Sequence, residues 1–148
     1  MIDNEKNVAF WDKAAAHHAS SSVPFAGMLM EGREFEAMYR LEAEQKHFLK
    51  LFQCTPASRV LEVGSGGGRW AFFLAEQVAS YVGLDISTKM IEISEAECWR
   101  RGLANTNFMC TSLIEYKTSE KFDLIFFSGV LQYMDDEVVT ASLNRAVR

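Results

Sequence analysis

The sequence has no excess of basic residues. Its 148 residues contain 15 Lys and Arg against 20 Asp and Glu, which gives a formal net charge of −5. Proteins that bind nucleic acid concentrate basic residues to displace counterions from phosphates, so this charge argues against DNA or RNA as a partner. We therefore expect a small-molecule substrate.

Paired cysteines and long apolar segments are also missing. Cys54, Cys98 and Cys110 are widely spaced, with no C-x-x-C pair and no neighbouring histidines, so we expect no metal site and buried, reduced thiols. No segment has the length needed to span a membrane, and the start MIDNEKNVAF lacks the basic and apolar regions of a signal peptide. We expect a cytoplasmic protein with no membrane partner.

The most informative segment is residues 59–74, RVLEVGSGGGRWAFFL. Arg59 to Val63 has the aliphatic and β-branched content of a buried strand. The glycines that follow allow a tight turn and a close approach of the backbone to a ligand, and a helix is expected to begin at Arg69. This succession predicts a ligand site at the carboxyl end of a strand, where open α/β sheets bind their ligands.

The chain resembles the class I methyltransferases that use S-adenosylmethionine. Glu62, Gly64, Gly66 and Gly68 fit the pattern E-x-G-x-G-x-G, and Leu84 to Ser87 carries the second motif. The resemblance covers residues from about Asn7 to the C-terminus.

The resemblance implies a role for each motif. In the family the glycine motif holds the methionine part of the cofactor, and an acid that ends the second strand holds the ribose hydroxyls. Asp85 has that second position, and one carboxylate suits two adjacent hydroxyls. The resemblance also implies that Ser128 lies under the methionine part through its backbone.

The adenine contacts follow from the same resemblance. Ile86 and Leu113 match the apolar residues that enclose the adenine ring, although core packing explains them nearly as well. Ser112 occurs where relatives place an acid that accepts a hydrogen bond from the adenine amino group. A neutral hydroxyl loses charge assistance there, at a cost of roughly 1 kcal/mol.

A dinucleotide site is the alternative interpretation of the glycines. Counted from Gly64, the pattern G-x-G-x-x-G fails because Arg69 replaces the third glycine, but counted from Gly66 it survives as G-x-G-x-x-A through Ala71. Glu62 has no role in the dinucleotide pattern, which favours S-adenosylmethionine. A nicotinamide-dependent oxidoreductase fragment and a non-catalytic cofactor-binding subunit remain as alternative functions.

The methyl acceptor is less well defined than the cofactor. Methyl transfer from a sulfonium needs mainly alignment and exclusion of water, so few catalytic side chains are expected, and we assign none. Tyr133, His17 and His18 are weak candidates for a base. The segment after Ser128 lacks the N/D-P-P-Y/F signature of many N-methylating relatives, and Leu131-Gln132-Tyr133 is similar to the Leu-Gln-Trp of relatives that esterify carboxylates. An oxygen acceptor is favoured.

The order of elements predicts a doubly wound, Rossmann-like parallel sheet in a single domain, residues 1–148. Residues 1–54 form a helical cover and a flanking helix, and residues 55–148 form the cofactor-binding core. Strands are expected at 59–63, 80–86, 107–113 and 122–127, and helices at 4–19, 33–52, 69–79, 88–101 and 136–147.

The last residues of the sequence suggest that the sheet is incomplete. Relatives complete their sheet with a fifth parallel strand and a hairpin, whereas this sequence stops inside an expected helix. We expect a C-terminally incomplete sheet that is completed by a missing C-terminal segment or by pairing in a homodimer.

Overall fold

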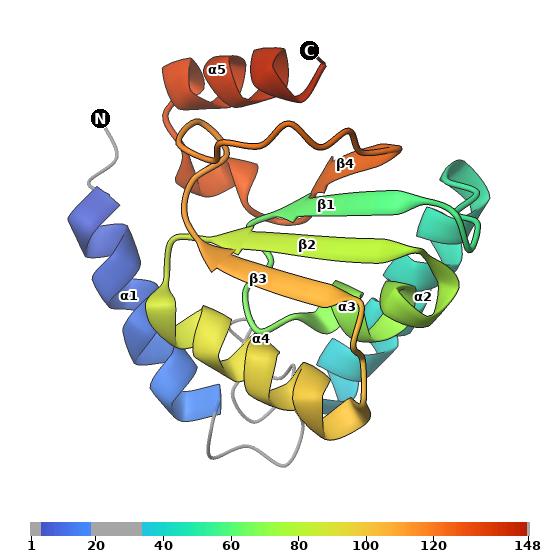
Figure 1. Ribbon diagram of the computed structural model, residues 1–148. Helices are drawn as coiled ribbons and strands as arrows, with labels where there is room; N and C mark the ends of the chain where they lie inside the picture. The colour runs from blue at the N-terminus through green and yellow to red at the C-terminus, as the bar shows by residue number, and fades with distance from the viewer. Residues whose placement is uncertain (1–3, 19–33, 148) are drawn as a thin grey trace.

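A parallel four-stranded sheet in the order β3-β2-β1-β4 forms the centre of the molecule (Figure 1). The computed structural model describes residues 4–18 and 34–147. The elements are α1 (Asn4–His18), α2 (Glu34–Leu51), β1 (Arg59–Val63), α3 (Arg69–Leu74), the 3₁₀ helix η1 (Ala75–Gln77), β2 (Ser80–Asp85), α4 (Thr88–Arg101), β3 (Thr106–Cys110), β4 (Leu124–Phe127), the 3₁₀ helix η2 (Leu131–Tyr133) and α5 (Asp136–Ala146). This architecture confirms the predicted Rossmann-like fold.

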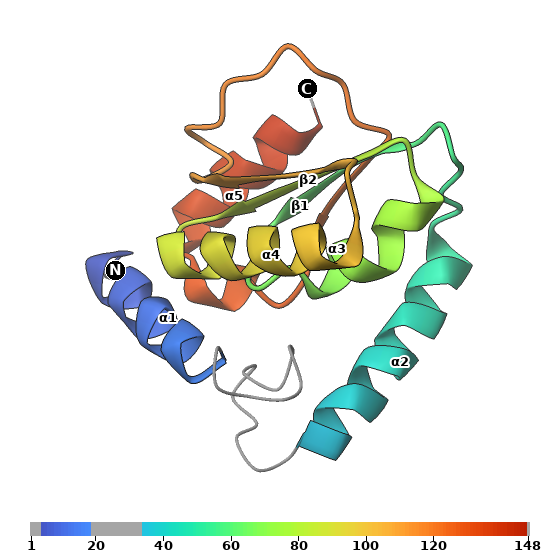
Figure 2. The ribbon, with the colours of Figure 1, turned by 60° about the horizontal axis from the view of Figure 1, so that its bottom comes forward.

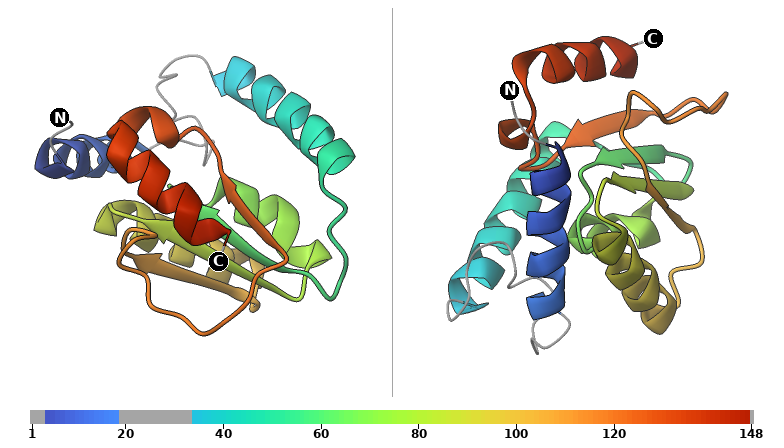
Figure 3. Two further views of the ribbon diagram at one scale, coloured as in Figure 1. Left: turned by 90° about the horizontal axis from the view of Figure 1, so that it is seen from above. Right: turned by 90° about the vertical axis from the view of Figure 1, so that its left-hand side faces the viewer.

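Helices cover both faces of the sheet, as Figures 2 and 3 show. Successive residues of a strand point to opposite faces, so each strand supplies two apolar layers. Val60, Tyr81 and Phe126 pack with residues of α2, α3 and α4, while Leu61 and Leu84 belong to a second cluster that contacts α5. Parallel strands buried on both faces need this nearly continuous apolar content.

Two elements have the predicted bounds, and their ends follow from local chemistry. β1 spans Arg59–Val63 and α4 spans Thr88–Arg101. The Ser87 hydroxyl caps α4 by accepting a 3.2 Å hydrogen bond from the Met90 N–H. Gly102 ends the helix in the left-handed conformation, at φ 71°. Both capping predictions are confirmed.

Other bounds were predicted wrongly. The helix expected to reach Ala79 leaves the α-conformation after Leu74 and finishes as η1. β3 ends at Cys110 instead of Leu113. The Thr111 N–H still bonds to Asp85 O of β2, but it also bonds to Met109 O in a tight turn that takes the chain away from the sheet. Ser112 and Leu113 therefore belong to the loop after β3. η2 was not predicted.

The helices of residues 1–54 contact the core separately. Phe48 of α2 packs against Trp70 and Phe126, with ring centroids 4.8 and 5.2 Å away. In α1, Asp12 accepts a 2.5 Å hydrogen bond from the hydroxyl of Ser87. α1 thus contacts α4 and the turn between β2 and α4 (Figure 1).

The cysteines are free, but only one is fully buried. Cys98 is buried and Cys54 half-buried, whereas Cys110 is exposed. The prediction of a buried thiol is wrong for Cys110, because this residue ends β3, an edge strand of the sheet. Within the described ranges, none of the helices is long and apolar enough to span a membrane.

Candidate functional site

A cleft of about 400 Å³ lies at the carboxyl ends of the strands, beneath α1. The parallel pairing of β1 and β2 aligns Val63 with Leu84, so the glycine turn after β1 and the acid that ends β2 lie side by side. The predicted cofactor residues that line the cleft are Glu62, Gly64, Gly66, Asp85, Ile86, Ser112, Leu113 and Ser128. Residues up to 66 positions apart in this group therefore share one cavity.

The glycine turn is fastened to β2 by backbone hydrogen bonds. The N–H groups of Gly64 and Ser65 both donate to Leu84 O, at 2.7 and 2.9 Å. Gly64 has φ +77°, and a Cβ there would lie 2.5 Å from Val130. Gly66 has φ +51°, but a Cβ there would meet no atom within 4 Å, because it would project into the open cleft. Of these two glycines, only Gly66 therefore leaves open space above its Cα for a ligand.

Gly68 does not line the cleft with the other predicted residues. Its φ is +87°, and an added Cβ would lie 2.9 Å from Ser94 of α4. Gly68 therefore allows α3 to begin in close contact with α4. The structure thus gives Gly68 a packing role, and its contact with a cofactor stays a prediction.

The Asp85 carboxylate joins the glycine turn after β1 to the loop after β2. Its Oδ2 accepts from the Gly66 N–H at 2.8 Å, and its Oδ1 accepts from the Ser87 N–H at 2.9 Å. Burial raises the pKa of Asp85, while these backbone hydrogen bonds act in the opposite direction. A carboxylate has about four acceptor positions, so Asp85 keeps acceptor capacity for hydroxyl groups of a ligand.

Glu62 is buried at the floor of the cleft, where it is 1% exposed. The hydroxyl of Tyr81, on the neighbouring strand, donates a hydrogen bond to Glu62 Oε2. Burial raises the pKa of Glu62 to about 8, because the charged form loses its hydration there. Near neutral pH the group is therefore largely a neutral acid, able to donate as well as to accept.

The loop after β3 supplies a carboxylate that sequence reasoning missed. The Ser112 hydroxyl donates to Glu115 Oε2 at 3.0 Å and accepts from the Glu115 N–H at 3.3 Å. Glu115 lines the cleft beside Leu113 and Ile86. The spacing S-x-x-E is typical of a capping turn, and it was the sequence signal that could have drawn attention to Glu115.

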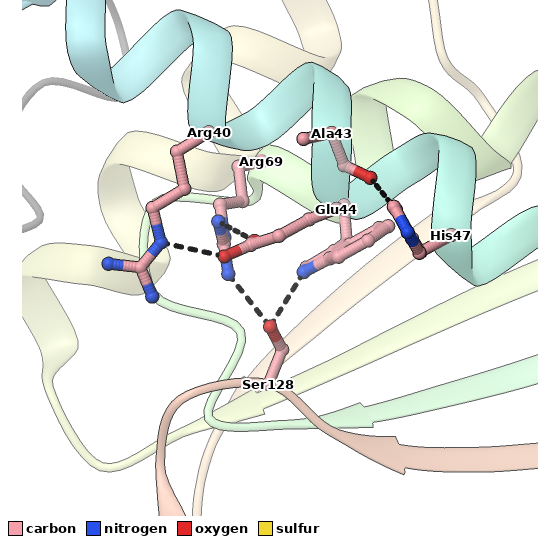
Figure 4. A network of polar contacts seen from close by, with 7 residues as sticks. Arg40, Ala43, Glu44, His47, Arg69 and Ser128 are labelled. Carbon is pink, nitrogen blue, oxygen red and sulfur yellow. Dashed lines mark hydrogen bonds and ion pairs between the residues drawn. The ribbon is translucent and has the colours of Figure 1, made fainter.

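Ser128 lies in a network that joins α2, α3 and the end of β4 (Figure 4). Its Oγ accepts from Arg69 Nη2 at 2.7 Å and from Trp70 Nε1 at 2.9 Å. Arg69 Nη1 in turn donates to Glu44 Oε2 at 2.8 Å. The side chain of Ser128 thus has a structural function beyond the predicted role of its backbone, and Arg69 was not predicted to face the cleft.

An aromatic pair closes the cleft on the side of α1. The rings of Trp11 and Tyr133 meet edge to face, with centroids 5.1 Å apart, and both residues line the cleft. The Asn7 side chain donates to Tyr133 O at 3.0 Å. Of the three candidate bases, Tyr133 is thus brought to the cleft, whereas the side chains of His17 and His18 lie outside the described part of the chain.

The cleft fits an adenosine-containing cofactor. The hydroxyl of Ser65 is buried without a hydrogen-bond partner in the described structure, and it lines the cleft. The space above Gly66 accepts a ligand, Asp85 has acceptor positions for hydroxyls, and Ile86 and Leu113 provide apolar contact for a ring. Over residues 4–18 and 34–147, no group of three or more His, Cys, Asp or Glu side chains is arranged to hold a metal ion.

Comparison with known proteins identifies a common family. Residues 60–148 match the family described as methyltransferase domain. The ubiquinone biosynthesis O-methyltransferase of Coxiella burnetii is 32% identical over 78 residues, which are 52% of this chain and 33% of that protein. The chain spans a third or less of the length of this and other curated relatives that it matches.

Solved structures share the fold at low sequence identity. The Haemonchus contortus phosphoethanolamine N-methyltransferase 1, in complex with phosphoethanolamine and S-adenosylhomocysteine, has a TM-score of 0.77 at 21% identity; the match covers 95% of this chain and 28% of that one. The magnesium protoporphyrin IX methyltransferase of Synechocystis PCC 6803, with bound S-adenosylmethionine, has a TM-score of 0.71 at 17% identity; this match covers 99% of this chain and 71% of that one.

Proposed function

The chain belongs to the methyltransferase domain family, and we propose that it transfers the methyl group of S-adenosylmethionine to an oxygen atom of a small molecule. S-adenosylmethionine is the cofactor of this class I family, and both solved relatives carry it or its product. We propose in addition that the accepting oxygen belongs to a hydroxyl or a carboxylate group.

One observation carries the proposal: the glycine turn and Asp85 line a single cleft and are hydrogen-bonded to each other. Asp85 would hold the ribose hydroxyls, Ile86 and Leu113 the adenine ring, and Ser112 with Glu115 the adenine amino group. Glu62, Gly64, Gly66 and Ser128 would surround the methionine part. In these assignments the ribose hydroxyls and the adenine amino group, which are hydrogen-bond donors, each have an acceptor in the cleft.

The bound cofactor supplies the methyl group and its leaving group, so the protein's own residues need to align an acceptor and exclude water. Trp11 and Tyr133 lie at the side of the cleft formed by α1, where they would contact the acceptor. The Tyr133 hydroxyl is the one candidate base whose position in the cleft is described. We therefore assign acceptor alignment to this aromatic pair and to α1.

Two sequence features support an oxygen acceptor. The loop after β4 lacks the N/D-P-P-Y/F signature, and it contains Leu131-Gln132-Tyr133. A panel of labelled methyl-transfer reactions with phenols, carboxylates and amines tests the choice. Methylated phenols or carboxylates are the expected products. Methylation of amines alone would contradict an oxygen acceptor. Binding of cofactor without transfer to any acceptor would instead favour a non-catalytic subunit.

The sheet edge suggests how further chain segments associate. In the described part of the chain, β4 is an edge strand with the apolar sequence Leu124-Ile125-Phe126-Phe127. We propose that a strand from a further segment or from a second copy pairs there, since edges of this composition are normally covered. Light scattering should then show association of the 148-residue chain, and a monodisperse monomer at high concentration would count against pairing between copies. Cytoplasmic residence and the division at residue 54 remain predictions.

A further inference from the structure

The carboxyl group of Glu62 is in contact with Tyr81 on one side and with the cleft on the other. Glu62 lines the cleft, and the Tyr81 hydroxyl donates a hydrogen bond to its Oε2. Tyr81 itself is fully buried and does not line the cleft. A ligand in the cleft can therefore contact Glu62 directly, whereas Tyr81 can act on that ligand only through Glu62.

The pairing of the strands explains why Tyr81 is the partner of this acid. Gly83 of β2 lies opposite Glu62 and has no side chain, and Phe126 of β4, opposite it on the other side, is apolar. A Cβ added at Gly83 would lie 2.6 Å from Phe108, so a larger side chain does not fit there. Tyr81 is two residues before Gly83 on the same face of the sheet, and its hydroxyl reaches Glu62 from that position.

The groups around Glu62 act on its charge in opposite directions. Burial has the largest effect and raises its pKa to about 8. The hydrogen bond from Tyr81 and the positive charge of Arg69 lower the pKa, whereas the negative charge of Asp85 raises it. Cys98 of α4 faces Tyr81, and burial raises the pKa of both of these groups, so neither ionises near neutral pH. The free protein therefore holds a proton on Glu62 near pH 7, and the Tyr81 hydroxyl favours its loss.

We propose that Tyr81 is a positioning residue for Glu62 and that the binding of an S-adenosyl ligand drives the proton of Glu62 into the solvent. The inference rests on the proposed function, because it assumes the S-adenosyl cofactor with its methionine part beside Glu62. That part carries an ammonium group, and a nearby positive charge favours the ionised acid. The O–H bond of the carboxyl group breaks, a buffer base takes up the proton, and Tyr81 stabilises the remaining negative charge by donating to Oε2.

Calorimetry in several buffers counts the released protons without any methyl acceptor. S-adenosylhomocysteine is titrated at pH 7 into the unmodified chain in phosphate, HEPES and imidazole, whose heats of ionisation differ. The dependence of the binding heat on the buffer should correspond to release of roughly 0.9 proton, the fraction that a group with a pKa of about 8 holds at this pH. The matched ligand 5′-methylthioadenosine has no ammonium group, so it should bind without releasing a proton.

Glu62→Gln identifies the source of the proton. The amide cannot titrate, so the release that accompanies binding of S-adenosylhomocysteine should disappear in this variant. Asp85 is the other buried acid whose pKa is raised in the cleft, and it is unchanged in Glu62→Gln. Release that persists in Glu62→Gln would come from Asp85 or another group and would overturn the inference.

Tyr81→Phe tests the positioning role through the pH dependence of binding. Without the hydroxyl, ionisation of Glu62 is less favourable, so the affinity for S-adenosylhomocysteine should fall by about fivefold or more at pH 6.5. At pH 8.5 more of Glu62 is already ionised, so the loss should shrink to less than half of that factor. Tyr116→Phe is the matched control, because Tyr116 is also buried but belongs to the other cluster and does not line the cleft. We expect its affinity to be unchanged at both pH values.

The outcomes separate the inference from the proposed function. Binding of S-adenosylhomocysteine to the unmodified chain without proton release would overturn the inference and leave the cofactor assignment intact. An equal loss of affinity at both pH values in Tyr81→Phe would reduce Tyr81 to a packing role and overturn its positioning of Glu62. If S-adenosylhomocysteine does not bind at all, the proposed function fails as well.

Infrared difference spectra of the unmodified chain, with and without S-adenosylhomocysteine, replace Tyr81→Phe if its melting curve shows that this variant does not fold. Binding should remove a protonated-carboxyl band and shift a tyrosine band, and both changes should be absent in Glu62→Gln. Loss of the carboxyl band without any shift of a tyrosine band would overturn the role of Tyr81.

Discussion

The backbone N–H of Gly66 donates a 2.8 Å hydrogen bond to Asp85 Oδ2. This bond joins the turn after β1 to the end of β2, and the Ser87 N–H bonds to the other oxygen of the same carboxylate. The two loops that would hold a cofactor therefore position each other before any ligand is bound. Such preorganisation lowers the entropic cost of binding.

Replacement of Asp85 should weaken cofactor binding without affecting the remote end of the sheet. We expect Asp85→Ala to reduce the affinity for S-adenosylhomocysteine by roughly 1 to 3 kcal/mol, through loss of charge-assisted hydrogen bonds. Asp123→Ala is the matched control, because the Asp123 carboxylate also accepts from a backbone N–H, that of Arg59, but at the start of β1. Calorimetric titration of both variants checks the difference, and equal losses would contradict the assigned ribose contact.

A branched side chain at Gly66 should abolish binding. Gly66→Val fills the open space of the cleft and also strains the backbone at φ +51°. Gly102→Val serves as the control for strain alone, because Gly102 has φ +71° and open surroundings at the end of α4, outside the cleft. We expect both variants to lose stability in thermal unfolding and only Gly66→Val to lose cofactor binding. Retained affinity in Gly66→Val would exclude a ligand above this turn.

Glu62 should make the free energy of unfolding depend on pH. Burial raises its pKa from the ordinary value of 4.5 to about 8, so between these values the folded chain holds a proton that the unfolded chain has lost. Raising the pH through this window therefore destabilises the fold, by an amount on the order of 4 kcal/mol. The pKa of Glu97 is lowered to about 2, so its contribution to stability changes with pH only below 4.5 and does not overlap with that of Glu62.

Urea unfolding at pH 5, 6.5 and 8 measures this effect. In Glu62→Gln the amide can still accept from the Tyr81 hydroxyl, but it cannot titrate, so the loss of stability with rising pH should become much smaller. An unchanged pH profile in Glu62→Gln would show that other groups cause it. The raised pKa of Asp85 acts in the same direction, so a residual slope is expected.

Glu115 should contribute to recognition of the adenine end. Glu115→Gln is expected to weaken binding of S-adenosylhomocysteine by about 1 kcal/mol, because the acceptor beside Ser112 loses its charge. Glu92→Gln is a control on an exposed acid that pairs with Lys89 on α4 and does not line the cleft. Comparable affinity of the two variants in fluorescence or calorimetric titrations would remove Glu115 from the site.

Local sequence signals predicted the parts of the site that lie on short segments. The apolar residues of β1, the glycines after it and the acid at Asp85 each have a chemical reason to occur where they do, and the parallel sheet aligns them. Ser87 and Gly102 predicted the ends of α4 because capping depends on nearby residues. These features involve neighbours in sequence or adjacent strands in register.

Contacts between distant segments could not be predicted in this way. Arg69 meets Glu44 across 25 positions and Ser128 across 59, and no motif links the three residues. The end of β3 was missed for a different reason: Cys110 to Leu113 suits a strand by composition, but the Thr111 N–H bonds to Met109 O in a tight turn and the chain leaves the sheet. Tertiary hydrogen bonds decided the first case, and a local turn decided the second.

Cofactor choice is the central claim, and a calorimetric titration of the 148-residue chain with S-adenosylhomocysteine and with NAD tests it most directly. Because Glu62 and Asp85 line one cleft with the glycine turn, we predict saturable, one-to-one binding of S-adenosylhomocysteine and no comparable binding of NAD. Tighter binding of NAD, or the absence of heat with S-adenosylhomocysteine, would contradict the account.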